Sequence, residues 1–187
     1  MEKAEKNRVA ILIDGGNFYK KIRRDGLIPK GTRFDYVKFA KFLANSRPVV
    51  SKRYYIGIVR NFDNTARSQQ MVESQQKLLT GLENDGYEIR KGKIVYDNDI
   101  REKGVDVQIA IDLVIDAAED RYDTAIIVSS DTDLIPAIRY IKSKGKTVEH
   151  VGFSNAPSFG MIKESDVRVL LHKEQIESLR QNSQPAK

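Results

Sequence analysis

Short apolar runs alternate along the chain with longer segments in which apolar residues recur every three or four positions. A short run rich in β-branched residues is typical of a strand buried on both faces, and the longer period is typical of a helix. The runs predict strands at residues 9–13, 54–59, 125–128 and 147–151, with an edge strand at 166–171. The periods predict helices at residues 18–24, 36–44, 64–84, 105–118 and 134–141.

Two of these regions have patterns of their own. Residues 87–96 alternate in polarity and predict either one strand or a hairpin that turns at Gly92. The helix predicted at 105–118 is apolar almost all round, which favours deep packing. Strands that alternate with helices predict an α/β fold, in which a mainly parallel sheet carries helices on both faces and the domain has three layers. We expect one domain at residues 1–180 and a disordered tail at 181–187.

Acidic residues follow the apolar runs at the points where predicted strands end. Asp14 ends the first strand, and Asp131 and Asp133 follow the strand at 125–128. In an open α/β sheet the binding crevice lies beyond the carboxyl ends of the strands. If these two strands are neighbours, the three carboxylates meet at one rim, and the helix that begins at residue 105 brings Asp106 to them.

Clustered carboxylates repel one another unless a cation neutralises them. Mg²⁺ prefers oxygen ligands, binds through few carboxylates and accepts phosphate oxygens from a substrate. A bound ion of this kind stabilises charge that develops on a phosphodiester. The spacing favours a divalent-metal site made of Asp14, Asp106, Asp131 and Asp133, with Asp112 as a candidate ligand from one turn deeper in the helix.

Helix capping is the alternative explanation for the same residues. Asp and Asn are favoured N-caps, and acidic residues in a first turn suit the helix dipole. Asn17 would cap the helix at 18–24, and the four acidic residues also lie close to predicted helix starts. However, Asp131 and Asp133 are two acids where capping needs one. The two glycines after Asp14 allow a ligand to approach the backbone closely, although a turn explains them too.

Composition narrows the class of protein. The chain has 187 residues, of which 40% are apolar, as is typical of a globular domain. It has no cysteine, so disulfides and thiolate metal sites are excluded, and no apolar stretch is long enough to span a membrane. We therefore expect a cytoplasmic protein. The net charge of +6 permits a nucleic-acid partner but does not require one.

Other phosphate-handling classes fit the sequence less well. The P-loop motif of NTPases is absent. A phosphatase of the haloacid-dehalogenase type has two acids after the first strand, and a Toprim domain has a glutamate there, whereas this chain has Asp14 followed by two glycines. His150 and His172 lie away from the acidic motifs and are expected to be structural or surface residues, and Asp116 is expected on the surface.

Three motifs together resemble the NYN domain, in the LabA-like (DUF88) branch of the PIN-like nuclease superfamily. The motifs are AILIDGGNFY, KGVDVQIAIDLV and IIVSSDTDLIPAIRYIKSKGKTVEHVGF, and the resemblance covers residues 9–171. It implies a PIN-like, Rossmann-like α/β/α sandwich and metal-dependent ribonuclease chemistry with Mg²⁺ or Mn²⁺. By position, the residues of the family's site correspond to Asp14, Asn17, Asp106, Asp131 and Asp133, with Asp112 at a position that is often acidic.

We therefore expect a metal-dependent endoribonuclease that cuts single-stranded RNA. Basic residues near the motifs are candidates for contacts with RNA phosphates, although a solvated surface explains them as well: Lys20, Lys21, Arg23, Arg24, Arg101 and Lys103. Of Phe18 and Tyr19, either could stack on a base, and at least one is expected in the core. The alternative function is a non-catalytic RNA-binding or regulatory module that retains the acidic site. A homodimer through residues 64–84 and 87–96 is a further expectation.

Overall fold

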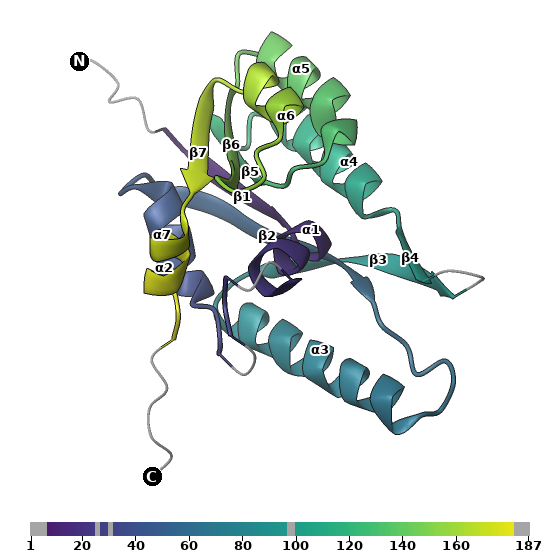
Figure 1. The fold of residues 1–187 in the computed structure, drawn as a ribbon. Helices are drawn as coiled ribbons and strands as arrows, with labels where there is room; N and C mark the ends of the chain where they lie inside the picture. The colour runs from purple at the N-terminus through teal and green to yellow at the C-terminus, as the bar shows by residue number, and fades with distance from the viewer. Residues whose placement is uncertain (1–6, 25–26, 30–31, 97–99, 182–187) are drawn as a thin grey trace.

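The computed structural model is an α/β fold with a seven-stranded sheet (Figure 1). The structure describes residues 7–24, 27–29, 32–96 and 100–181. The strands are β1 (Val9–Asp14), β2 (Val49–Ile58), β3 (Glu88–Tyr96), β4 (Ile100–Lys103), β5 (Thr124–Val128), β6 (Thr147–Phe153) and β7 (Val167–Leu171). Their order is β4-β3-β2-β1-β5-β6-β7, and all neighbours are parallel except β3 and β4. The predicted α/β class and the mainly parallel sheet are confirmed.

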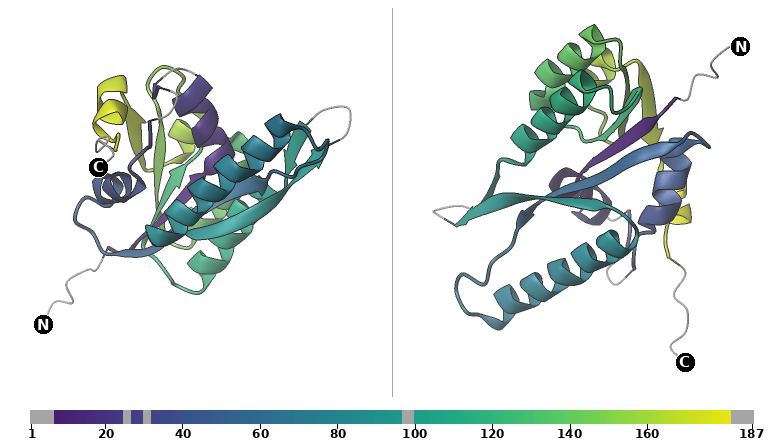
Figure 2. Two further views of the ribbon diagram at one scale, coloured as in Figure 1. Left: turned by 90° about the horizontal axis from the view of Figure 1, so that it is seen from below. Right: turned by 180° about the vertical axis from the view of Figure 1, so that it is seen from behind.

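Helices cover both faces of the sheet, so the molecule has the predicted three layers (Figures 1 and 2). They are α1 (Gly15–Tyr19), the π-helical turn η1 (Lys20–Arg24), α2 (Tyr36–Ala44), α3 (Ala66–Asn84), α4 (Val105–Ala118), the 3₁₀ turn η2 (Thr132–Leu134), α5 (Ile135–Ser143), α6 (Phe159–Glu164) and α7 (Lys173–Ser178). The core on one face includes residues of α1, η1, α2, α3 and α7, and the core on the other includes residues of α4, α5 and α6. Strand β1 serves both cores, because Val9, Ile11 and Ile13 face the first and Ala10 and Leu12 face the second.

Most predicted elements begin and end close to where the structure has them. Helices α2 and α4 have the predicted bounds, whereas the short elements β4, α6 and α7 were not predicted. The predicted tail lies outside the described residues except for Gln181, whose backbone N–H donates to the carbonyl oxygen of Arg33 at 2.9 Å. Within the described part of the chain, no helix has the length and apolarity needed to cross a membrane.

The first helix differs from the prediction in its cap. Helix α1 begins at Gly15, and its N-cap is Asp14, whose Oδ1 accepts the backbone N–H of Asn17 at 2.9 Å. The predicted capping role of Asn17 is therefore wrong. A Cβ on Gly15 would lie 2.3 Å from Cε1 of Tyr54 and 2.7 Å from the carbonyl oxygen of Tyr55. Glycine at this position lets α1 pack directly against β2.

Strand β3 is continuous, so the single-strand alternative for residues 87–96 is right and a turn at Gly92 is wrong. The strand pairs in parallel with β2 up to Lys93 and antiparallel with β4 from Lys93 onward. A Cβ on Gly92 would lie 2.5 Å from Cγ2 of Val105. The glycine is needed because the first turn of α4 crosses β3 at this point. Residues 97–99, between β3 and β4, lie outside the described part of the chain.

Helix α4 is deeply packed on its inner face, but its outer face is exposed although it carries apolar residues. Val107, Ile111 and Ile115 lie four residues apart on its outer face, and Val107 is 62% exposed. The inner face instead carries Asp112 and Asp116, which are both buried. The predicted surface position of Asp116 is therefore wrong. The number of apolar residues in such a helix cannot show which side faces the sheet. In α4 that side is determined by charged partners on another strand, such as Arg53 of β2.

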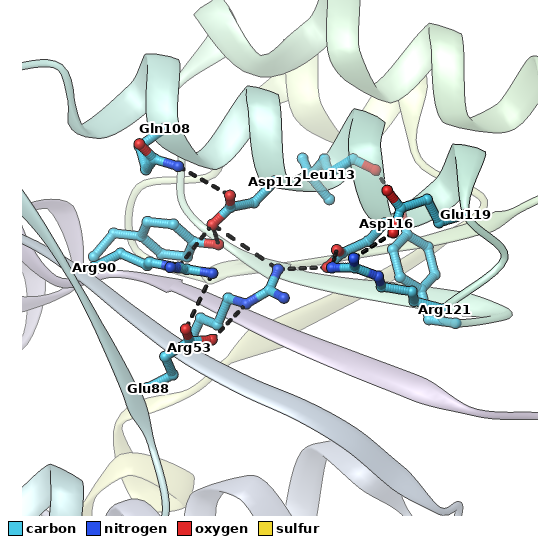
Figure 3. Close-up of polar contacts among 11 residues, drawn as sticks. Arg53, Glu88, Arg90, Gln108, Asp112, Leu113, Asp116, Glu119 and Arg121 are labelled. Atoms are coloured by element: carbon cyan, nitrogen blue, oxygen red, sulfur yellow. Dashed lines mark hydrogen bonds and ion pairs between the residues drawn. The ribbon is translucent and has the colours of Figure 1, made fainter.

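A layer of ion pairs joins α4 to β2 and β3 (Figure 3). Buried Arg53 of β2 donates to Asp116, which also accepts from Arg121 at 2.9 Å. The same guanidinium lies 3.0 Å from Glu88 of β3. A buried charge is tolerated only when it is paired and hydrogen-bonded. Arg53 is thus the buried cation that holds the inner face of α4 on the sheet.

Asp112 belongs to the same layer, one helical turn before Asp116 (Figure 3). It accepts hydrogen bonds from the Tyr55 hydroxyl and the Gln108 amide, both at 2.9 Å. Arg90 Nε lies 3.2 Å from the same carboxylate. Burial raises the pKa of Tyr55 above its ordinary value, so the hydroxyl stays protonated and acts as a donor. These contacts set the rotation of α4 about its axis and hence the direction of its first turn.

Candidate functional site

Two strand ends meet where the sequence predicted a shared rim. Strands β1 and β5 are parallel neighbours, with Ile13 opposite Val128. Asp14 at the end of β1 is buried, and its Oδ2 accepts the hydroxyl hydrogen of Ser129, which follows β5, at 2.9 Å. Its Oδ1 accepts the N–H of Asn17, as described above. The Asp14 carboxylate is therefore held in place from both sides of the junction between the strands.

The side chain of Asn17 links the same two loops. Its Oδ1 accepts the backbone N–H of Ser130 at 3.3 Å and the Ser130 hydroxyl at 3.0 Å. The hydroxyl oxygen of Ser129 in turn accepts the N–H of Asp131 at 3.1 Å. These bonds fix the loop after β5 against α1. They show that the serines of the SSDTD motif shape the rim.

Asp131 and Asp133 follow this loop at the start of η2. Asp131 caps the 3₁₀ turn, because its Oδ1 accepts the backbone N–H of Asp133 at 2.9 Å. Asp131 is half-buried and Asp133 is exposed. Capping therefore explains the carboxylate of Asp131, but it does not explain that of Asp133. The sequence expectation that one cap would not account for two acids is consistent with this geometry.

Asp106 lies in the first turn of α4, after Gly104, which adopts the left-handed conformation with φ of 83°. The Asp106 carboxyl is half-buried. Burial raises its pKa to about 6, and the negative charges of Asp131, Asp14 and Asp133 add to the shift in that order. The four acids named from the sequence therefore act on one region of space, although they come from three separate segments.

The donor set consists of carboxylate oxygens, which hard cations such as Mg²⁺ and Mn²⁺ prefer. Burial is the first cause of the raised pKa of Asp106, and the three neighbouring negative charges that add to it are ones that a divalent cation would neutralise. Among the described residues, no three acidic or histidine side chains are close enough to hold a metal ion as they lie. The chemistry of the residues fits a divalent ion, and side chains such as the exposed Asp133 would have to move to bring the ligands together.

A stability measurement tests the raised pKa of Asp106 directly. Because the folded pKa is about 6 and the ordinary value is 3.8, the charged carboxylate disfavours the fold as the pH rises from about 4 to above 6. Asp106→Asn should raise the free energy of unfolding at pH 7.5 by about 1–2 kcal/mol, allowing for solvent screening. The gain should vanish near pH 4. Urea unfolding in EDTA at both pH values measures it.

Asp63 provides a control of opposite sign, because hydrogen bonds from Ser68 and Thr65 lower its pKa. Its charged form favours the fold, so Asp63→Asn should lower stability at pH 7.5 and have less effect as the pH falls. A gain for Asp106→Asn that persisted at pH 4 would point to a packing effect and contradict the assignment to charge.

Asp112, the further candidate ligand, belongs to the ion-pair layer, where it contacts Tyr55 and Arg90. It is not among the charges that raise the pKa of Asp106. The sequence analysis missed the partners of Asp112 and Asp116, which are Arg53, Tyr55, Arg90, Gln108 and Arg121. The signal for them was present, because two acids four residues apart in an apolar helix require cations on the element that the helix covers.

The basic residues predicted to contact nucleic acid lie on two elements. Lys20, Lys21 and Arg23 belong to η1, and Arg23 donates to the carbonyl oxygens of Pro29 at 2.6 Å and Thr32 at 2.5 Å. Lys103 is exposed at the end of β4. The side chains of Arg24 and Arg101 lie outside the described part of the structure.

The remaining side chains singled out from the sequence divide between core and surface. Phe18 is buried among aromatic rings, with its centroid 5.2 Å from that of Phe34, whereas Tyr19 is 53% exposed. His150 is fully buried, and burial lowers its pKa to about 4, so it is neutral at physiological pH. His172 is exposed at the N-cap of α7. Both histidines lie where the sequence expectation allowed.

Comparison with known proteins gives the chain a family. The NYN domain family matches residues 8–170. A curated relative, the uncharacterized protein MJ0482 of Methanocaldococcus jannaschii, is 28% identical over 155 residues, which are 81% of this chain and 51% of the relative. The chain thus spans about half the length of that relative. The crystal structure of VPA0982 from Vibrio parahaemolyticus, a protein of unknown function, superposes with a TM-score of 0.69 at 25% identity and covers 91% of this chain and 96% of its own. With a family match that extends over most of its length, the chain belongs to the NYN domain family, within the PIN-like nuclease superfamily.

Proposed function

We propose that this chain is a metal-dependent endoribonuclease that hydrolyses phosphodiester bonds in single-stranded RNA. The observation that carries the proposal is the shared negative field of Asp14, Asp106, Asp131 and Asp133 at the carboxyl ends of β1 and β5. Membership of a nuclease superfamily supports the reaction class. The sequence motifs favour the LabA-like branch, and a cytoplasmic location is part of the same proposal.

Four carboxylates would hold Mg²⁺ or Mn²⁺, directly or through water: Asp14, Asp106, Asp131 and Asp133. When bound, such an ion supplies Lewis-acid stabilisation of the charge that develops on the phosphodiester. Asp106 would give up its proton readily near neutral pH, because its pKa is about 6. Ser129 holds the carboxylate of Asp14 in its buried position.

Other residues position these acids or contact the substrate. Asn17 holds the loop after β5 through Ser130 and keeps Asp131 beside Asp14. Asp112 acts through α4, since its oxygens accept from Tyr55 and Gln108. Lys20, Lys21 and Lys103 would attract the RNA backbone. The homodimer expected from the sequence stays a prediction.

A non-catalytic RNA-binding module is the second candidate. It is favoured by the finding that, within the described residues, the acids do not form a ready-made group of three around one point. In such a module the acidic rim would serve as an ion or partner site. The two candidates make different predictions about turnover, and both predict binding of RNA.

Turnover in the presence of metal distinguishes the two. With end-labelled single-stranded RNA, we expect internal cleavage in Mn²⁺ or Mg²⁺ and a rate at least about 100-fold lower in EDTA. Retention of RNA on a gel without any product would favour the module. Absence of both binding and cleavage would contradict both candidates.

A further inference from the structure

A groove of about 720 Å³ lies between η1 and the C-terminal half of α3, and we call it the η1–α3 groove. Its lining includes Tyr19, Arg23, Arg33, Lys77 and Gly81. Helix α3 lies on the same face of the sheet as α1 and η1, and its C-terminal end is the part near α1 (Figure 1). The volume falls within the range of roughly 300–1,000 Å³ that is usual for ligand sites.

The groove combines positive charge with an exposed aromatic ring. Arg23, Arg33 and Lys77 contribute three cations to its lining, against the single carboxylate of Asp85. Arg23 is fixed in place by its hydrogen bonds to the carbonyl oxygens of Pro29 and Thr32. Arg33 and Lys77 are exposed and stand where an anionic backbone would reach them. A positively charged groove with a stacking ring is the usual means of holding a single nucleic-acid strand.

Tyr19 is exposed because of its place in α1. Its neighbour Phe18 is anchored in the aromatic core, with its ring centroid 5.4 Å from that of Phe39. Successive residues of a helix point in directions about 100° apart, so burying Phe18 turns Tyr19 toward solvent. Tyr19 is also the last residue of the short helix that begins beside Asp14. The helix has five residues, so Tyr19 follows Asp14 by only about 7–8 Å of helix.

Gly81 is an independent indication that the groove is kept open. It lies inside α3, its φ is not positive, and a Cβ on it would meet nothing within 4 Å. Neither the backbone conformation nor packing therefore requires glycine, which destabilises a helix interior relative to alanine. The missing side chain leaves space in the wall of the groove opposite η1.

We propose that the η1–α3 groove binds one nucleotide of single-stranded RNA. The base stacks on Tyr19, the flanking phosphates contact Lys77 and Arg33, and Gly81 leaves room for the sugar and base. This assignment rests on the proposed function, because it extends the path of the substrate away from the acidic rim. The preference for single strands would then come from the stacking of an unpaired base on Tyr19.

Binding measurements without turnover test the groove. The affinity for a labelled single-stranded oligoribonucleotide would be measured in EDTA over a series of salt concentrations. Tyr19→Ala should weaken binding at least about five-fold and leave the salt dependence unchanged, because it removes stacking. Lys77→Ala should reduce the slope of log K against log salt by about 0.7, the value for one lost phosphate contact. Gly81→Gln should weaken binding while its melting temperature equals or exceeds that of the wild type.

Helix α5 offers a matched pair of controls. Tyr140 is 38% exposed, and Lys144 Nζ lies 5.3 Å from the centroid of its ring, but neither residue lines the groove. Tyr140→Ala and Lys144→Ala remove the same chemical groups and should bind RNA within about two-fold of the wild type.

The results separate failure of the groove from failure of the proposed function. If the wild type binds and cleaves RNA and all three groove variants bind like it, the groove is excluded and the endoribonuclease stands. If the wild type does not bind RNA at all, the proposed function fails and the groove with it. A loss of affinity in the α5 controls equal to that in the groove variants would also overturn the assignment.

Discussion

Asp131→Asn is expected to lower the rate of RNA cleavage about 100-fold or more without loss of the fold. Oδ1 of Asp131 accepts the backbone N–H of Asp133, and the carbonyl oxygen of asparagine accepts the same hydrogen bond. The substitution therefore keeps the cap of η2 and removes only the negative charge. Initial rates in Mn²⁺, together with the melting temperature in EDTA, measure the two effects separately.

Asp35→Asn is a matched control for this substitution. Asp35 caps α2 in the same way, with Oδ1 accepting the N–H of Lys38 at 2.8 Å, and it does not contribute to the pKa of Asp106. It should retain the wild-type rate. Equal rates for Asp131→Asn, Asp35→Asn and the wild type would remove Asp131 from the metal site.

The same variant has a second readout that does not depend on activity. After burial, the charge of Asp131 is the largest contribution to the raised pKa of Asp106. With that charge removed, the pKa of Asp106 should fall toward its ordinary value. The stabilisation expected from Asp106→Asn should then be smaller in the Asp131→Asn background. This coupling would appear in urea unfolding even if the protein were a non-catalytic module.

The strands could be predicted from short apolar runs, because a strand of a parallel sheet is buried on both faces and is therefore apolar along its length. The apolar run at the start of the chain became β1, and the one before SSDTD became β5. Their adjacency was a condition of the predicted acidic site, and the structure confirms it. That topology places Asp14, Asp131 and Asp133 at the carboxyl ends of β1 and β5, whereas Asp106 comes from the first turn of α4.

What the sequence did not reveal depends on contacts between distant elements. The orientation of α4 is decided by Arg53, more than fifty residues earlier in the chain, and not by the helix's own pattern. For the same reason the exposure of Val107 on the outer face was not foreseen. From the sequence, Gly15 was expected to form a turn or to let a ligand approach the backbone. In the structure, glycine is needed there because the ring of Tyr54 lies too close for a Cβ. Periodicity describes a segment alone, and these features need two segments at once.

Arg53→Met is expected to lower the free energy of unfolding by about 3–5 kcal/mol. Burial lowers the pKa of Arg53, but the hydrogen bonds and negative charges of its partners, Asp116 first among them, together raise it above its ordinary value, so the guanidinium stays charged. Methionine would fill much of the space of the arginine stem and leave buried Asp116 with Arg121 as its remaining partner. Urea unfolding at pH 7.5 measures the loss.

Arg139→Met is the comparison for an exposed ion pair. Arg139 donates two hydrogen bonds to Glu164 on the surface, at 2.6 Å and 3.0 Å. The substitution should leave the urea midpoint almost unchanged, because exposed ion pairs contribute little to stability. A double variant that combines Arg53→Met with Asp116→Leu should recover part of the stability, since it removes both buried charges. A loss for Arg53→Met as small as that for Arg139→Met would mean that Arg121 alone neutralises Asp116. In that case apolar packing, through residues such as Leu113, would set the rotation of α4 and the direction of Asp106.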